Sequence, residues 1–172
     1  WWSAFGSAKL DEVMRKCKPI AVIHLAGLIV VSESVKDPAQ YYLNNVSGSI
    51  GLLDAMRRNG IERIVFSSSA AVYGEPETTP IPETAPTLPA NPYGASKLAV
   101  DTALAEYAQM QGFGAVSLRY FNVAGAYQAA SGDWFGERHD PETHLIPNVL
   151  GDGESPLSVR INGIGLVSYR AE

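Results

Sequence analysis

Three side chains of the sequence have types and spacings that suit acid–base chemistry on an alcohol. Tyr93 and Lys97 are four residues apart, so a helix would place both on one face. An ammonium group beside a phenol favours the phenolate, and a phenolate can accept a proton from a hydroxyl group near neutral pH. Ser69 follows an apolar run and could hydrogen-bond the same substrate oxygen. Together these residues suit the removal of hydride from an alcohol.

The residues around this pair favour chemistry over a simpler interpretation. A Tyr-x-x-x-Lys spacing is common, and by itself it also fits a solvated lysine beside a tyrosine at a helix start. Here Asn91 and Pro92 predict the first turn of a helix, because asparagine caps free amides and proline suits that turn. The pair also follows a predicted strand that ends in serines and a proline-rich loop.

Apolar runs and helix-breaking residues predict the elements that position these side chains. Strands are expected at residues 20–25, 63–66 and 115–120, and helices at 11–18, 37–58 and 92–111. Six prolines between positions 76 and 92 exclude a helix or a central strand there and predict an ordered loop. Helices that alternate with apolar strands are typical of an α/β fold whose parallel sheet is covered on both faces. We therefore predict a Rossmann-like doubly wound parallel sheet, present in part, with the start of a small second domain.

The element pattern weakens beyond about Gly125. Residues 132–136 and 142–147 predict irregular structure, with one short helix after Pro147, and residues 151–172 predict no element. We expect residues 1–125 to form the domain that carries the chemistry. Residues 126–172 are expected to form an irregular segment on the substrate side.

Composition and charge exclude several other classes of protein. The formal net charge is −5 and no basic run occurs, so nucleic acid is not an expected partner. The longest apolar stretch, residues 20–31, is too short to span a bilayer, and the first residues do not form a convincing signal peptide. The single cysteine, Cys17, can form neither an internal disulfide nor a zinc site. We expect a cytoplasmic protein that uses no metal and no membrane.

Several ordered stretches of the chain resemble the extended short-chain dehydrogenase/reductase family, and within it the nucleotide-sugar epimerases. The matching stretches are residues 21–28, 33–35, 41–46, 66–74, 91–97 and 118–122. They read AVIHLAGL, ESV, YYLNNV, FSSSAAVYG, NPYGASK and LRYFN. The resemblance covers roughly residues 10–150, and motifs in this order at these spacings are specific to the family.

The resemblance implies a tightly held NAD and a uridine diphosphate sugar as substrate. It implies epimerisation at C4 between the glucose and galactose forms, through a transient 4-keto sugar, and so a part in galactose metabolism. It makes residues 1–125 part of an NAD-binding domain. It also implies a homodimer that pairs through the helix containing Gly48 and Gly51 and the helix containing Tyr93.

The resemblance further implies a role for each site residue, carried over by its position in the matching motifs. Tyr93 would be the base, Lys97 would bind the nicotinamide ribose and polarise Tyr93, and Ser69 would bind the substrate oxygen. The NAD site would include Leu25, Ala26, Gly27, Asn44, Ser67 and Phe121, besides Tyr93 and Lys97. The nucleotide sugar would contact Asn122, His144 and Leu145.

Simpler structural interpretations stand beside several of these roles. Leu25 to Gly27 also fit a plain strand end, and Asn44 fits a polar group inside a helix. Ser67 and Ser68 fit hydrogen bonding within a turn. His24 fits a hydrogen-bonded core histidine better than a catalytic base.

The chain departs from the family pattern in two ways. Ile29 occupies the position where epimerases usually carry a lysine that approaches the cofactor. The chain also has no Gly-x-x-Gly-x-x-Gly sequence with a following acidic residue, although these hold the pyrophosphate and the adenosine ribose in this fold. The complete fold would need about twice this length.

Other functions remain open beside C4 epimerisation of the glucose and galactose forms. One is another sugar-nucleotide epimerase, and a second is a dehydratase or decarboxylase of the same superfamily. A dehydratase needs an additional acid and base beside the strand-end serine, and residues 69–73 (SAAVY) contain no carboxylate. A third is a catalytically inactive structural or dimerisation module, since the phosphate loop is absent from the sequence.

Overall fold

The computed structural model describes residues 7–123, 125–136 and 146, and the chain divides into two compact units, Trp1–Phe121 and Asn122–Glu172. The first unit contains α1 (Ser7–Cys17), β1 (Val22–His24), α2 (Val31–Lys36), α3 (Pro38–Tyr41), the π-helix η1 (Tyr42–Ser47), α4 (Gly48–Arg58), β2 (Arg63–Ser69), the 3₁₀-helix η2 (Ala70–Tyr73), α5 (Pro92–Gln111) and β3 (Gly114–Tyr120). In the second unit, β4 (Ala126–Gln128) and β5 (Trp134–Gly136) form an antiparallel hairpin.

Strands β1, β2 and β3 form one parallel sheet in that order, with β2 in the centre. β2 pairs with β3 along its whole length, from Arg63 opposite Gly114 to Ser69 opposite Tyr120. The prediction of an α/β fold with a parallel sheet is therefore confirmed. β2 continues past its predicted end at Phe66, so the three serines belong to the strand itself.

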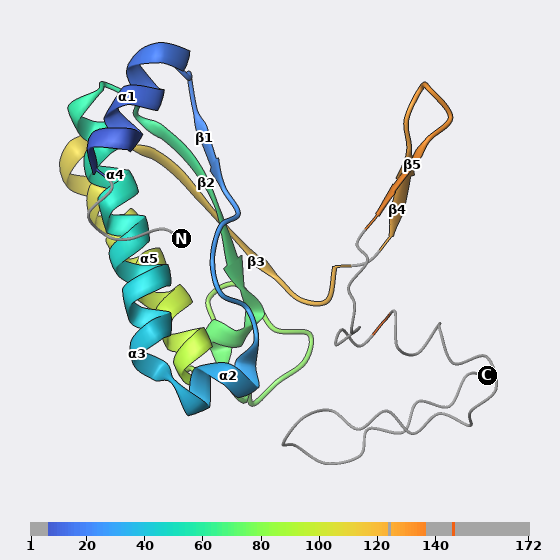
Figure 1. The fold of residues 1–172 in the computed structure, drawn as a ribbon. Helices are drawn as coiled ribbons and strands as arrows, with labels where there is room; N and C mark the ends of the chain where they lie inside the picture. The colour runs from blue at the N-terminus through green and yellow to red at the C-terminus, as the bar shows by residue number, and fades with distance from the viewer. Residues whose placement is uncertain (1–6, 124, 137–145, 147–172) are drawn as a thin grey trace. The chain divides into compact units, whose positions relative to one another are not determined.

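Helices α1, α4 and α5 lie together on one face of this sheet (Figure 1). The core that they form with the sheet includes Met14, Leu52, Leu53, Met56, Ile61, Ile64, Phe66, Val100, Leu104 and Phe113. On the opposite face Ile23 is 70% exposed and Val116 is 51% exposed. Among the described residues the three long helices all pack on one side of the sheet, and apolar side chains on the other side are exposed.

The predicted helix over residues 37–58 forms as three consecutive segments, α3, η1 and α4. Asp37 caps its start, where the carboxylate accepts a hydrogen bond from the backbone N–H of Gln40 at 3.1 Å. The π-helical segment η1 is a feature that the hydrophobic pattern does not predict. Such segments change the rotation of the side chains that follow and are frequent at functional sites.

The predicted helix after Asn91 also forms. The Asn91 side chain accepts a hydrogen bond from the backbone N–H of Gly94 at 2.8 Å, and Pro92 occupies the first turn. Gly112, with φ of +72°, ends the helix in the left-handed conformation that glycine adopts without strain. Tyr93 and Lys97 therefore lie in the first two turns of α5.

Other segments differ from the prediction. α2 and η2 form where no element was expected, and residues 132–136, predicted to be irregular, contribute β5. The hairpin turn is closed by the backbone N–H of Ala129, which donates to the carbonyl of Asp133 at 2.9 Å. The helix predicted after Pro147 and residues 151–172 lie outside the described residues. Among the helices that the structure describes, none is long and apolar enough to cross a membrane.

Candidate active site

The Lys97 side chain joins helix α5 to the end of the central strand. It is 3% exposed, and its Nζ donates a hydrogen bond to the backbone carbonyl of Ser67 at 2.8 Å. The same Nζ lies 4.9 Å from the centre of the Phe66 ring and 5.9 Å from the centre of the Tyr93 ring. A cation this close to an aromatic face is attracted by it. The ammonium group is thus held between β2 and Tyr93.

Burial makes Lys97 unusually ready to give up its proton. Loss of hydration lowers the pKa of Lys97 to about 8, and the carboxylate of Asp101 opposes this shift. At neutral pH the side chain is therefore still largely cationic. A cation held in a water-poor site stabilises a neighbouring negative charge more strongly than it would in water. Lys97 is placed to stabilise a phenolate on Tyr93.

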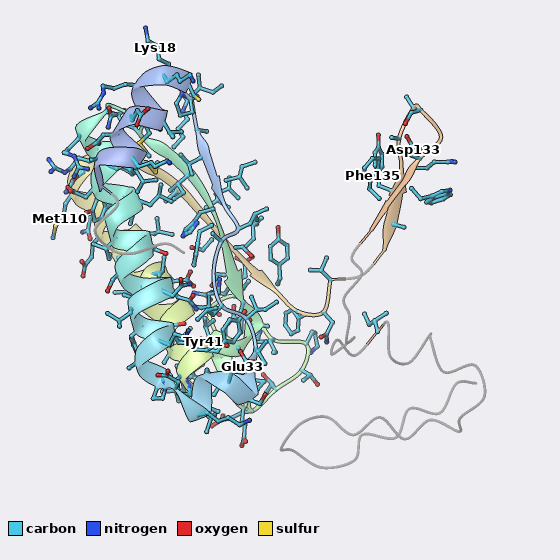
Figure 2. The ribbon with its side chains drawn as sticks, viewed as in Figure 1. Lys18, Glu33, Tyr41, Met110, Asp133 and Phe135 are labelled. Atoms are coloured by element: carbon cyan, nitrogen blue, oxygen red, sulfur yellow. The ribbon has the colours of Figure 1, made fainter. Side chains whose placement is uncertain are left out.

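Tyr93 lies in the first turn of α5 and is partly exposed. Its ring packs edge-on against Tyr41, with ring centres 6.5 Å apart. Tyr41 is fully buried and donates its own hydroxyl to the backbone carbonyl of Val30 at 2.6 Å. Figure 2 shows Tyr41 at the same end of the first unit as Glu33 of α2, opposite the end that carries Lys18. Tyr41 therefore supports the Tyr93 ring from the side.

Ser69 ends β2 close to the start of α5. Its Oγ accepts a hydrogen bond from the backbone N–H of Ala71 at 3.1 Å, which begins the 3₁₀ turn η2. A Cβ atom on Gly94 would lie only 2.5 Å from the carbonyl oxygen of Ala71. Helix α5 and η2 can approach this closely only because position 94 is glycine. Ser69 and Tyr93 are thus both brought to the end of the sheet where β2 terminates.

Asn45, which the sequence interpretation did not single out, connects three segments of the site. Its Oδ1 accepts from the backbone N–H of Leu28 at 2.8 Å, and its Nδ2 donates to the Leu28 carbonyl at 3.0 Å. The same Nδ2 lies 3.1 Å from Oγ of Ser96 on α5. The residue is 4% exposed and lies in η1. A signal was present in the sequence, because an asparagine pair inside a largely apolar helix needs buried partners.

A small cavity of about 30 Å³ lies beside this asparagine. It is lined by His24, Ala26, Gly27, Asn44, Gly48 and Leu52. A Cβ atom on Gly27 would lie 3.2 Å from Oδ1 of Asn45 and 3.5 Å from Nζ of Lys97. The backbone after β1 therefore passes close to Lys97 at a position without a side chain. Ala26, Gly27 and Asn44, all predicted from the sequence to line one site, do come together here.

His24 is held by hydrogen bonds rather than free to act as a base. Its Nε2 lies 2.8 Å from Oγ of Ser49, and Ser49 donates its hydroxyl to the carbonyl of Asn45 at 2.5 Å. Because that hydroxyl proton is already donated, we assign the ring proton to Nε2. Burial first, and then the charge of Lys97, lower the pKa of His24 to about 4. The ring is therefore neutral at pH 7, which fits a structural role.

The remaining predicted residues are placed less tightly. Leu25 and Phe121 are each 66% exposed, and Ile29 is 46% exposed. Asn122, also exposed, belongs to the second unit. Two predicted sugar contacts, His144 and Leu145, lie outside the described residues. The structure thus groups the predicted residues of α5, β2 and the segment after β1.

A parallel α/β sheet with a Tyr–Lys helix pair and a strand-end serine defines the class of short-chain dehydrogenase/reductase-like proteins. The sequence profile of one family within this class matches residues 5–166. The chain belongs to the NAD dependent epimerase/dehydratase family. The resemblance predicted from the motifs is therefore confirmed.

Known relatives agree with this assignment. The chain is 50% identical over 141 residues to a UDP-glucose 4-epimerase of Rhizobium leguminosarum bv. trifolii, covering 81% of this chain and 42% of the relative. It resembles the crystal structure of UDP-glucose 4-epimerase from Brucella ovis in complex with NAD, with a TM-score of 0.78 and 49% identity over 85% of this chain and 44% of that one. The enzyme from Bifidobacterium longum, in complex with NAD+ and UDP, gives a TM-score of 0.69 and 40% identity over 73% and 38%. The chain thus spans less than half the length of these relatives.

Proposed function

We propose that the protein carrying this chain is an NAD-dependent epimerase that inverts C4 of a uridine diphosphate sugar and so interconverts the glucose and galactose forms. The observation that carries the proposal is the placement of Lys97. This buried ammonium group donates a hydrogen bond to the Ser67 carbonyl near the carboxyl end of the central strand and lies 5.9 Å from the Tyr93 ring centre. The named activities and bound ligands of the relatives support the choice of reaction, cofactor and substrate.

In the proposed reaction Tyr93 acts as the base. Its phenolate oxygen takes the proton of the 4-hydroxyl group, while Lys97 stabilises the negative charge on Tyr93 before the transfer. The hydroxyl of Ser69 hydrogen-bonds the same substrate oxygen and keeps it in line with Tyr93. After the keto sugar has turned over, Tyr93 returns the proton to the oxygen at C4. The contribution of bound NAD is to take up the C4 hydride and give it back to the opposite face of the sugar.

The described residues fit such a cofactor. The backbone at Gly27 approaches Lys97 where no side chain intervenes, and the adjoining cavity is lined by Ala26, Gly27 and Asn44. We propose that these residues and Lys97 hold the cofactor, with the Lys97 ammonium donating to a ribose hydroxyl. The side chain of Ile29 can donate no hydrogen bond, so we expect its contact with the cofactor to be apolar.

We propose further that the protein is a cytoplasmic homodimer. Exposed apolar side chains lie along the helical segments of the first unit, among them Val35 (63%), Tyr42 (44%) and Leu43 (63%). At Gly51 a Cβ atom would meet nothing within 4 Å, so another backbone can approach α4 there. The exposed and unpaired Cys17 fits a reducing compartment.

The proposal is tested with the purified protein at its full natural length. UDP-galactose and UDP-glucose should interconvert, and acid denaturation should release NAD that is detected by its absorbance. UDP-N-acetylglucosamine serves as the comparison substrate, because preferential turnover of it would assign a different epimerase. A dehydrated product, or decarboxylation of UDP-glucuronate supplied in a parallel assay, would overturn the proposed reaction. A protein without NAD or turnover would favour an inactive structural module.

A further inference from the structure

A buried carboxylate one turn after Lys97 takes no part in the proposed reaction. Asp101 is 9% exposed, and its Oδ2 accepts from Oγ of Ser68 at 3.0 Å and from Nε of Arg119 at 3.3 Å. Its Oδ1 is buried and has no hydrogen-bond partner among the described residues. A buried acceptor without a partner costs free energy, so packing alone does not explain an aspartate at this position.

The hydrogen bonds of Arg119 extend this contact to the turn that follows the serines. Its Nη1 donates to the hydroxyl of Tyr73 at 2.8 Å, and its guanidinium lies 5.0 Å from the centre of the Tyr73 ring. Tyr73 is the last residue of η2, the turn that begins with the Ser69 hydrogen bond. Asp101 and Arg119 thus tie α5, β2, β3 and η2 together.

The position of Ser68 connects these contacts to the site. Ser68 lies between Ser67, whose carbonyl holds Lys97, and Ser69, the proposed substrate contact. We propose that Asp101 is a positioning residue for the epimerase. Asp101 fixes the end of β2 against α5 and so keeps Lys97 and Ser69 correctly placed relative to Tyr93. This inference rests on the proposed function, because it concerns the same site.

The charge of Asp101 adds a second effect on Lys97. The titratable groups that face Lys97 are His24 from β1 and Tyr93 and Asp101 from α5. Asp101 in turn contacts Arg119 from β3, which contacts Tyr73 from η2. His24 is neutral, and Arg119 is a permanent cation that also interacts with Asp101. Asp101 raises the pKa of Lys97 against the lowering effect of burial. When the charge of Asp101 is removed, Lys97 should therefore lose its proton at a lower pH.

The test uses the full-length enzyme and the isosteric variant Asp101→Asn. We expect kcat to fall on the order of tenfold with little change in KM, because the reacting groups are misplaced rather than lost. The alkaline limb of the kcat profile should move down by about one pH unit. Asp101→Glu should restore that limb at least in part. The matched control is Asp54→Asn, which removes an exposed carboxylate paired with Arg57 on α4 and should leave both quantities unchanged.

Two further measurements test the role of Asp101 independently. If Asp101→Asn does not fold, Ser68→Ala removes only the hydroxyl contact and should lower kcat while leaving the alkaline limb in place. Competitive acetylation of Lys97, followed by mass spectrometry across the pH range, reports its titration without turnover. A wild type without epimerase activity would overturn the proposed function and leave this readout intact. A folded Asp101→Asn variant with unchanged kcat and unchanged Lys97 titration would overturn the role of Asp101.

Discussion

Lys97 is costly to the fold and, in the proposed reaction, useful to the chemistry. A buried ammonium group loses hydration that the Ser67 carbonyl and the Phe66 ring replace only in part, which is why the pKa of Lys97 falls to about 8. Active sites commonly contain groups of this kind, whose removal increases stability and abolishes function. The conflict between the two roles can be measured on the same variant.

We predict that Lys97→Met raises the free energy of unfolding of the cofactor-free protein by about 1–2 kcal/mol at pH 7 while strongly reducing turnover. The unfolded chain holds the lysine proton up to about pH 10.5 and the folded chain only up to about pH 8. Between these values the unfolded state binds more protons, so wild-type stability rises with pH. Denaturant unfolding at pH 7 and pH 10 measures the free energy of unfolding of both proteins and its dependence on pH.

The control for this prediction is Lys9→Met, which changes an exposed lysine on α1. Its stability should follow the wild-type pH dependence, whereas Lys97→Met should lose the rise between pH 8 and pH 10. A Lys97→Met protein that is less stable than wild type at pH 7 would show that the buried ammonium group is stabilising.

Some residues of the site could be predicted from the sequence and others could not. Tyr93 and Lys97 follow from helix periodicity, because their spacing and the Asn91 cap both lie within seven residues. The asparagine pair indicates that Asn45 needs buried partners, but no local pattern identifies these as Leu28 and Ser96, which are 17 and 51 residues away. The catalytic and binding roles themselves stay predictions until variants are measured.

At the scale of the element, the two adjacent asparagine side chains of the π-helix η1 have different surroundings. Asn45 lies inside the fold and Asn44 lines the small cavity, although the two are adjacent. The Asn44 Nδ2 donates to Oδ1 of Asn45 at 3.1 Å, so the two amides are also linked. Asn45 is therefore expected to matter for stability and Asn44 for binding.

We predict that Asn45→Leu destabilises the protein by about 2–3 kcal/mol, because it leaves the N–H and carbonyl of Leu28 without their side-chain partner. The Ser96 Oγ would also lose one of its two hydrogen bonds and keep the one to the Tyr93 carbonyl. Asn44→Ala should change stability by less than about 1 kcal/mol and instead weaken NAD binding. Thermal unfolding and NAD titration of both variants check the contrast. Equal loss of stability in the two variants would contradict it.

The elements themselves were predicted where a single physical signal dominates. Apolar runs predicted all three strands of the sheet, and the caps and glycines predicted both ends of α5. The hairpin was missed because its short strands are exposed throughout and so have no hydrophobic pattern. Apolar residues of β1 and β3 also occupy the sheet face opposite the three long helices, which is typical of strands predicted to be buried on both faces.

At the scale of the whole molecule, the exposed apolar side chains of the helical segments support the proposed pairing of two copies. We predict that Leu43→Arg in η1 converts the full-length dimer to a monomer, because a charge would be buried without a partner at the interface. Light scattering at micromolar concentration measures the mass. Leu88→Arg, at a position in the proline-rich loop that is also exposed, should leave the dimer intact. A full-length wild-type protein that is itself monomeric would contradict the proposed homodimer.

The 172 residues alone are predicted to bind NAD poorly and to have little or no epimerase activity. The sequence has no glycine-rich phosphate loop, and the backbone amides of such a loop hold the pyrophosphate in this fold. Calorimetric titration of a polypeptide of verified mass with NAD tests this. Full turnover by that polypeptide would show that the missing loop is not needed.

The central claim is that Tyr93 is the base of the proposed reaction, and Tyr93→Phe tests it most directly. The substitution removes the hydroxyl group and keeps the ring that packs against Tyr41, so folding should be preserved and can be checked by circular dichroism. We predict that the full-length variant interconverts UDP-galactose and UDP-glucose more slowly by on the order of a hundredfold or more, since a general base contributes about 10²–10⁴-fold. Near-normal turnover by the folded variant would contradict the assignment of the base.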